Sequence, residues 1–303
     1  MTSSDKTKSV FVAIVGRPNV GKSSLLNALV GEKLAIVTSK PQTTRTRITG
    51  ILTRGMTQFV FLDTPGIHKP RTKLGQRMVK TVSESVGDGD LTLMIFEPYG
   101  ELTEAEQELV EQIRTGHVRA VAAINKTDCL KQSQDLAVRQ EFLRQLGVFD
   151  EILPVCAAKE EGIGSLLDLF ERYAAEGPHY FPEDAYTDLP EKAIVAELVR
   201  EKLLLNLRDE LPHGTAVMVE KFKEREEGGL IDIEVTIFCE KKSHKGMIIG
   251  KGGAMLKKIA TAARLDCEAF LGQKVNLQCW IKVKDDWRDN DFYLNNFGFR
   301  SNN

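Results

Sequence analysis

The sequence lacks the features of secreted and membrane proteins. Its first residues, MTSSDKTKS, contain no apolar stretch of the kind found in secretory signals. No run approaches the roughly 18 apolar residues that a membrane-spanning helix needs. The five cysteines form no C-x-x-C pair, and their odd number disfavours a disulfide framework. We therefore expect reduced thiols and a cytoplasmic location.

The chain also lacks a basic excess, internal repeats and low-complexity tracts. Its formal net charge is −2, so any nucleic-acid surface must be local. The hydrophobic content of 42% and charged content of 28% are those of globular proteins. A length of 303 residues leaves room for two domains of ordinary size.

The first 175 or so residues alternate between strand and helix patterns. Amphipathic stretches such as Glu104–Arg114 and Asp135–Gln145 separate short apolar runs. This alternation predicts an α/β fold with a mostly parallel sheet, helices on both faces and ligands beyond the carboxyl ends of the strands. The expected strands are 10–15, 48–53, 58–62, 91–96, 118–124 and 152–155.

A second pattern begins after the sequence GPHYFPED at 177–184, whose glycine and two prolines indicate a linker. We expect domains at 1–177 and 191–303, joined by 178–190. The second is predicted to be an α+β domain of about 100 residues, in which the first two strands of the sheet form a hairpin. Its expected elements are a helix at 191–206, hairpin strands at 217–222 and 231–237, a turn at 226–229, a helix at 254–265 and a strand at 275–283.

Residues 16–23, GRPNVGKS, match the phosphate-loop pattern G-x-x-x-x-G-K-[ST]. They lie between the strand expected at 10–15 and an apolar helical stretch at 24–30, as the motif requires. Backbone N–H groups and the helix dipole would attract phosphate there, with Lys22 reaching the β- and γ-phosphates and Ser23 binding Mg²⁺. The expected phosphate-binding residues are Gly16, Asn19, Val20, Gly21, Lys22, Ser23, Ser24 and Gly66.

Two further segments predict magnesium and γ-phosphate contacts. Asp63 directly follows the strand expected at 58–62, where it can hold Mg²⁺ through a water, and the Gly66 N–H can meet the γ-phosphate. The polar loop PQTTRT at 41–46 offers a threonine that binds Mg²⁺ only while GTP is present. Spacing alone leaves Thr43 and Thr44 as alternatives.

The segment NKTD at 125–128 predicts guanine as the base. The Asp128 carboxylate can accept from N1–H and the 2-amino group of guanine, a donor pair that adenine lacks. Asn125 can meet the base and brace the loop, and the Lys126 stem can cover the base plane. A backbone amide among Cys156, Ala157 and Ala158 can meet the guanine O6.

The set GRPNVGKS, QTTRT, DTPG and NKTD resembles the Era family of GTPases. The resemblance implies that Thr44 is the magnesium-sensing threonine of the first switch. Ile67 replaces the glutamine that orients water in many GTPases, and related proteins with an apolar residue there use an asparagine at the Asn19 position to bind K⁺. The residues expected to act in hydrolysis are therefore Thr44, Gly66 and Asn19. Era-like proteins usually carry a Ser-Ala pair in the last of their five guanine-nucleotide motifs. Here Cys156-Ala157 or Ala157-Ala158 must take its place.

Residues 241–258 hold six lysines and no acidic residue. Within them, Gly250–Gly253 form a G-x-x-G between an apolar turn at 247–249 and a helix. Glycines let a nucleic-acid backbone approach closely, and lysines add sequence-independent affinity. The order of elements resembles a type II KH domain, the C-terminal domain of Era proteins. The expected RNA contacts are Lys245, Gly250, Lys251, Gly252, Gly253, Lys257 and Lys258.

The resemblance covers nearly the whole chain and implies a GTP-hydrolysing switch. It also implies binding to the 3′ end region of 16S ribosomal RNA, assistance in assembly of the 30S subunit, and peripheral association with the inner membrane. We expect a monomer that takes GTP or GDP with Mg²⁺, and possible use of K⁺. Two alternatives stay open: a signalling GTPase whose C-terminal domain binds protein, and a KH scaffold that binds nucleotide only structurally.

Overall fold

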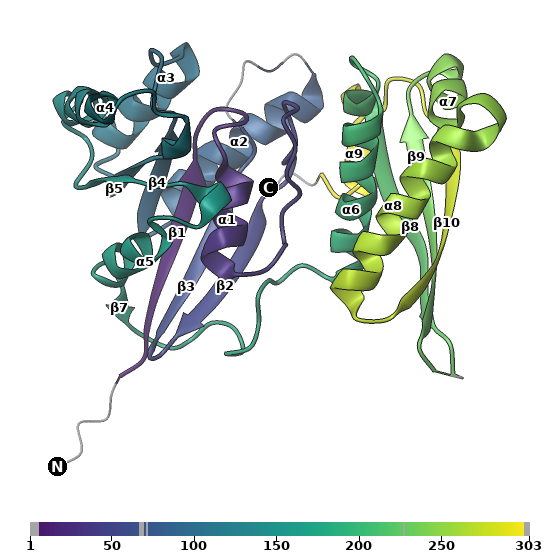
Figure 1. The fold of residues 1–303 in the computed structure, drawn as a ribbon, viewed down its shortest axis with the longest axis horizontal. Coiled ribbons are helices and arrows are strands. Elements are labelled where there is room, and N and C mark those ends of the chain that lie inside the picture. Colours follow the sequence, from purple (N-terminus) through teal and green to yellow (C-terminus); the bar gives the residue numbers. More distant parts are fainter. Residues whose placement is uncertain (1–5, 67–69, 71, 227, 300–303) are drawn as a thin grey trace. The chain divides into compact units, whose positions relative to one another are not determined.

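The computed structural model describes residues 6–66, 70, 72–226 and 228–299. The chain divides into two compact units (Figure 1). The N-terminal unit comprises Met1–Ala35, Thr44–Pro70 and Met78–Asp188, and the C-terminal unit comprises Ile36–Thr43, Arg71–Arg77 and Leu189–Asn303. Two short stretches of the N-terminal half of the sequence are thus part of the C-terminal unit.

The N-terminal unit is built on a mostly parallel sheet, as predicted. Among the described residues its order is β2-β3-β1-β4-β5-β6, and β7 pairs with β1. Of the strands in the described part of this unit, β2 and β7 alone run antiparallel to their neighbours, β3 and β1. The strands are β1 (Lys8–Val15), β2 (Ile48–Arg54), β3 (Thr57–Asp63), β4 (Leu91–Phe96), β5 (Ala120–Ile124), β6 (Ile152–Pro154) and β7 (Ala175–Glu176).

Helices cover both faces of this sheet because its strands are apolar on both sides. On one face, α2 (Lys73–Asp88), α3 (Glu104–Thr115) and α4 (Ser133–Gln145) pack over alternate residues of the central strands, including Met94 and Phe96. On the other face lie α1 (Lys22–Val30) and α5 (Ile163–Glu171). The sequence patterns single out α3 and α4 but neither α2 nor α5.

The C-terminal unit is an α+β domain with a three-stranded sheet in the order β10-β9-β8. Strand β9 (Leu230–Cys239) is central, antiparallel to β8 (Thr215–Glu224) and parallel to β10 (Lys274–Val283). Its inward residues, such as Ile233 and Val235, are fully buried against the helices. The helices are α6 (Glu191–Asn206), α7 (Lys242–Ile249), α8 (Ala254–Leu271) and α9 (Asp291–Asn296).

One local prediction in this unit is wrong. Residues 247–249 are not an apolar turn, because they form the last turn of α7, where Ile248 is fully buried in the core. Three consecutive apolar residues at the end of an eight-residue helix show no helical period, so the pattern could not reveal it. The predicted fold class, a P-loop domain followed by a KH domain, is confirmed.

Candidate nucleotide and RNA sites

The phosphate loop is shaped by glycine and leads directly into α1. Gly21 precedes the helix with a φ of 102°, a backbone conformation that disfavours side chains. A Cβ added at this position would overlap the amide nitrogen of Asn125. Within the part of the chain that the structure describes, no side chain caps α1, and the first turn of this helix holds no acidic residue. The helix N-terminus is therefore suited to an anionic ligand.

Lys22 is held across the loop by backbone carbonyls. Its Nζ donates to the carbonyl oxygens of Gly16 at 3.0 Å and Arg17 at 2.9 Å, and the residue is buried. Burial lowers the pKa of Lys22 to about 8, although Asp63 and Glu106 oppose the shift. A phosphate bound in the loop would favour the charged ammonium, so ligand binding and protonation of Lys22 support each other.

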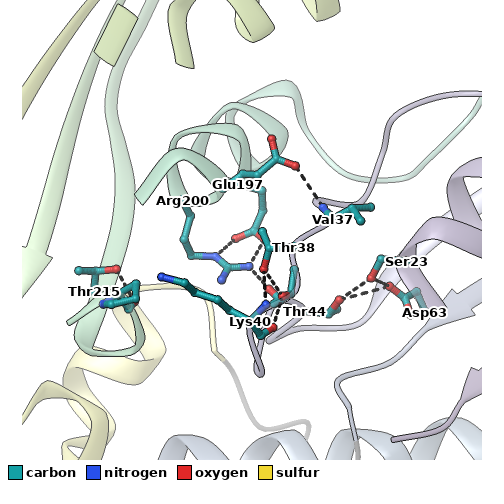
Figure 2. Close-up of polar contacts among 12 residues, drawn as sticks. Ser23, Val37, Thr38, Lys40, Thr44, Asp63, Glu197, Arg200 and Thr215 are labelled. Carbon is teal, nitrogen blue, oxygen red and sulfur yellow. Dashed lines mark hydrogen bonds and ion pairs between the residues drawn. The ribbon is translucent and has the colours of Figure 1, made fainter. Parts of the chain in front are cut away.

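Ser23, Thr44 and Asp63 converge on one point (Figure 2). The Ser23 hydroxyl lies 2.8 Å from both Thr44 Oγ1 and Asp63 Oδ2. Asp63 is fully buried, and its Oδ1 has no hydrogen-bond partner among the described residues. Burial raises the pKa of Asp63 to about 6, against the effects of Lys22, Ser23 and Thr44. Two hydroxyls and a carboxylate with an unused oxygen fit a hard cation such as Mg²⁺.

The structure separates the two threonines that spacing left open. Thr44 reaches Ser23 and Asp63, whereas the Thr43 hydroxyl donates to the carbonyl oxygen of Lys40 at 2.7 Å. Thr43 Oγ1 also lies 2.8 Å from Thr38 Oγ1. The side chain of Thr44 is thus at the candidate metal site, and that of Thr43 stabilises its own loop.

The segment that follows Asp63 is anchored to β1. Thr64 is fully buried and donates to the carbonyl oxygen of Ile14 at 2.7 Å. Gly66 packs against the phosphate loop, where an added Cβ would lie 2.8 Å from Pro18 Cα. Its backbone therefore lies beside the phosphate loop, and its contact with a γ-phosphate stays a prediction. Ile67, on which the prediction of atypical hydrolysis depends, lies outside the described residues.

Asn125 connects the phosphate loop with the segment Cys156–Ala158. Its Nδ2 donates to the carbonyl oxygen of Val20 at 2.9 Å, and its Oδ1 accepts from the Ala157 N–H at 3.0 Å. The buried thiol of Cys156 donates to Asp128 Oδ1 at 3.3 Å, so a sulfur atom contacts the carboxylate that is expected to bind guanine. Ala158 lies in the same short turn. Which of these amides meets guanine stays a prediction.

The sequence reasoning missed Glu97, which joins the phosphate loop to the guanine motif. Its carboxylate accepts from Arg17 Nη2 and, at 2.5 Å, from Lys126 Nζ. Lys126 also donates to the carbonyl oxygen of Asn19 at 2.7 Å. Its position in the sequence could have indicated this role, because Glu97 directly follows β4, and β4 is a neighbour of β1 in the sheet.

In the C-terminal unit, the G-x-x-G segment forms a tight turn before α8. Gly250 has a φ of 73°, and a Cβ there would lie 2.7 Å from Met255 Cβ. Gly252 has a φ of 59° with no atom within 4 Å of an added Cβ, so it faces open space. Gly253 directly precedes α8. The expected lysine contacts Lys245, Lys251, Lys257 and Lys258 are all exposed.

These features define a class: a P-loop protein built to bind a guanine nucleotide, with a KH domain after it. Residues 11–126 match the family described as 50S ribosome-binding GTPase, and residues 210–288 match the KH domain family. GTPase Era of Clostridioides difficile strain 630 is 46% identical over 292 residues, covering 96% of this chain and 98% of that protein. GTPase Era of Ruminiclostridium cellulolyticum is 47% identical over 295 residues, covering 97% and 98%.

Solved structures agree with these matches. A variant of Aquifex aeolicus Era bound to GDP and AlF4⁻ has a TM-score of 0.92 and 35% identity, covering 97% of this chain and 99% of that one. An Era structure with MgGDPNP and nucleotides 1506–1542 of 16S ribosomal RNA gives the same values. The chain belongs to the Era family, and it is a GTPase. Among the described residues, the helices are all too short or too polar to cross a membrane.

Proposed function

We propose that this GTPase binds the 3′ end region of 16S ribosomal RNA through its KH domain and assists assembly of the 30S subunit. The main support is the Era structure that holds both MgGDPNP and nucleotides 1506–1542 of 16S ribosomal RNA, with 35% identity across 97% of this chain. GTP binding and hydrolysis would control how long the RNA is held. The RNA-bound relative favours this function over a C-terminal domain that binds protein.

In the nucleotide site, loop amides and Lys22 would bind the phosphates, and Gly66 would meet the γ-phosphate. Ser23, Thr44 and Asp63 would hold Mg²⁺, which would neutralise charge on the phosphate oxygens. Asp128 would read guanine, and Lys126 would cover the base while its ammonium stays fixed to Glu97. Asn19, which has a φ of 63°, would contribute a ligand to K⁺, as the family resemblance suggests.

In the KH domain, the lysines of 241–258 would supply the phosphate contacts. Gly252 is exposed, with room beside its backbone for an RNA phosphate. The following helix, α8, has no acidic residue in its first turn and adds a favourable dipole.

The proposal is tested with an RNA of nucleotides 1506–1542 and the variant Gly252→Asp. The added carboxylate would stand where the phosphate is expected, and we predict at least about tenfold weaker RNA binding with unchanged GTP turnover. The matched control is Gly272→Asp at the other end of α8, also exposed, with a φ of 65° and no atom within 4 Å of an added Cβ. This control should bind RNA nearly as the parent chain does.

Equal losses in both glycine variants would show a general charge effect and contradict the assigned contact. Failure of the parent chain to bind this RNA with salt-dependent affinity would overturn the RNA proposal itself and favour the protein-binding alternative. Three properties stay predictions: the cytoplasmic location expected from the sequence, the peripheral membrane association implied by the family resemblance, and the monomeric state.

A further inference from the structure

The carboxylate of Glu97 joins two segments of the nucleotide site that lie far apart in the sequence. Its Oε2 accepts a hydrogen bond from Arg17 Nη2 of the phosphate loop, and its Oε1 accepts one from Lys126 Nζ of the guanine motif at 2.5 Å. All three residues belong to the N-terminal unit. They follow the carboxyl ends of β1, β4 and β5, which lie next to one another in the sheet (Figure 1). One side chain therefore contacts both the phosphate loop and the residue expected to cover the base.

The link continues from Lys126 to the backbone of Asn19. Lys126 Nζ also donates to the carbonyl oxygen of Asn19 at 2.7 Å. Both residues have a left-handed backbone conformation, with a φ of 62° for Lys126 and 63° for Asn19. This conformation costs free energy for a residue with a side chain and persists where surrounding contacts hold it. Because the ammonium of one strained residue holds the carbonyl of the other, a group that fixes this ammonium stabilises both.

Arg17 is the second point at which Glu97 holds the phosphate loop. The carbonyl oxygen of Arg17 accepts from Lys22 Nζ at 2.9 Å, while its guanidinium donates to Glu97. The carboxylate thus pairs with two cations, Arg17 and Lys126, which would repel each other without it. Glu97 is only partly exposed, and charge-assisted hydrogen bonds in such a network are stronger than isolated ion pairs at an open surface.

The backbone that carries Glu97 is fixed on both sides. Before it, the carbonyl oxygen of Phe96 accepts from the Asn125 N–H at 2.8 Å, which joins the end of β4 to the guanine motif. After it, the carbonyl oxygen of Gly100 accepts from Arg139 Nη1 of α4 at 2.7 Å. The carboxylate is therefore presented from a segment that is ordered without a ligand, as a group that positions others has to be.

We propose that Glu97 is a positioning residue that couples binding of the phosphates to binding of the guanine base. By holding the Lys126 ammonium, it fixes the stem of this lysine for contact with the base, and the same ammonium holds the phosphate loop at Asn19. The nucleotide then has less order to impose when it binds. The inference rests on the proposed role of Lys126 at the base. GDP and GTP share the base and the loop contacts, so Glu97 supports binding of both equally.

The experiment uses the full-length chain and the variants Glu97→Gln and Glu97→Asp. Affinities for fluorescent GDP and for a non-hydrolysable GTP analogue are measured with and without Mg²⁺. Glu97→Gln keeps the size of the side chain but removes its charge, so both affinities should fall about tenfold relative to the parent chain, with Mg²⁺ and without it. Glu97→Asp keeps the charge but is one methylene shorter, so it reaches the two cations less well and should fall in between.

The matched control is Glu171→Gln, which removes another carboxylate of the same unit that pairs with an arginine. Glu171 Oε2 accepts from Arg54 Nη2 at 2.7 Å, and its Oε1 accepts from Thr57 Oγ1 at 3.2 Å. Thr57 begins β3, at the edge of the sheet opposite the strand ends that carry the nucleotide site. Both nucleotide affinities of this control should stay within about twofold of those of the parent chain.

A double-mutant cycle separates positioning from a general loss of stability. In a Lys126→Ala background, Glu97→Gln should weaken GDP binding only about threefold or less, through Arg17. The full loss in that background, an equal loss in Glu171→Gln, or unchanged affinities in Glu97→Gln would overturn the proposal. If Glu97→Gln does not fold by circular dichroism, Glu97→Asp decides by the same comparison. Unchanged GDP affinity in Lys126→Ala alone would instead refute the proposed role of Lys126 at the base.

Discussion

A methyl group placed on Gly21 should damage the guanine site as well as the phosphate loop. The φ of 102° makes any side chain there strained, at a cost of about 1–3 kcal/mol. The new Cβ would also displace the Asn125 amide, which donates to Val20 and accepts from Ala157. Leaving those buried backbone groups unpaired costs about 1–3 kcal/mol each. A total of at least about 3 kcal/mol predicts roughly hundredfold weaker GDP binding for Gly21→Ala.

The assay is a fluorescent GDP titration, with urea unfolding to report stability. Gly31→Ala serves as the control, since Gly31 ends the same helix with a φ of 83° and has no atom within 4 Å of an added Cβ. This control should lose about 1 kcal/mol of stability and keep its GDP affinity within about twofold.

A double-mutant cycle isolates the part of the effect that passes through Asn125. In an Asn125→Ala background the amide is gone, so Gly21→Ala should weaken GDP binding by only about a further tenfold, from backbone strain. If the full hundredfold loss persists in that background, the clash with Asn125 is not its cause. GDP affinity unchanged in the single variant would refute the reasoning altogether.

Two further predictions concern a cation and the thiols. If Asn19 helps to bind K⁺, GTP turnover should be faster in KCl than in NaCl at equal ionic strength, and Asn19→Ala should remove the difference; equal rates for the parent chain would exclude this role. Burial raises the pKa of Cys267 to about 12 and of Cys279 to about 11, so at pH 8 their thiolate fractions are only about 10⁻⁴ and 10⁻³. With a thiol reagent at pH 8, the exposed Cys129 should give the fast phase, lost in Cys129→Ser, while Cys267 and Cys279 react only in urea. A fast phase that survives Cys129→Ser would contradict this assignment.

The nucleotide site was predictable because its residues follow strand ends. Gly16 comes directly after β1, Asp63 ends β3, and Asn125 comes directly after β5. Parallel strands bring their carboxyl ends to one edge of a sheet, so short motifs far apart in sequence meet there. The KH domain could also be predicted from a local pattern, because apolar and polar residues alternate along β9, as in a half-buried strand.

The remaining features depend on contacts that leave no local pattern. Glu97 is a lone carboxylate in a loop, and only the fold brings it to Arg17 and Lys126. Arg200 lies 157 positions from Thr43, whose carbonyl oxygen it contacts, and an arginine within a helix is normally expected at the surface. Nothing in the composition of 36–43 assigns this segment to the C-terminal unit rather than to the domain around it in sequence.

The membership of 36–43 in the C-terminal unit bears on how this protein can be dissected. A fragment ending at the linker, near residue 177, would retain this stretch but lose Arg200, Glu201 and the Leu207 carbonyl that bind it. Such a fragment would lack the hydrogen bonds that hold residues 36–43 in the intact chain.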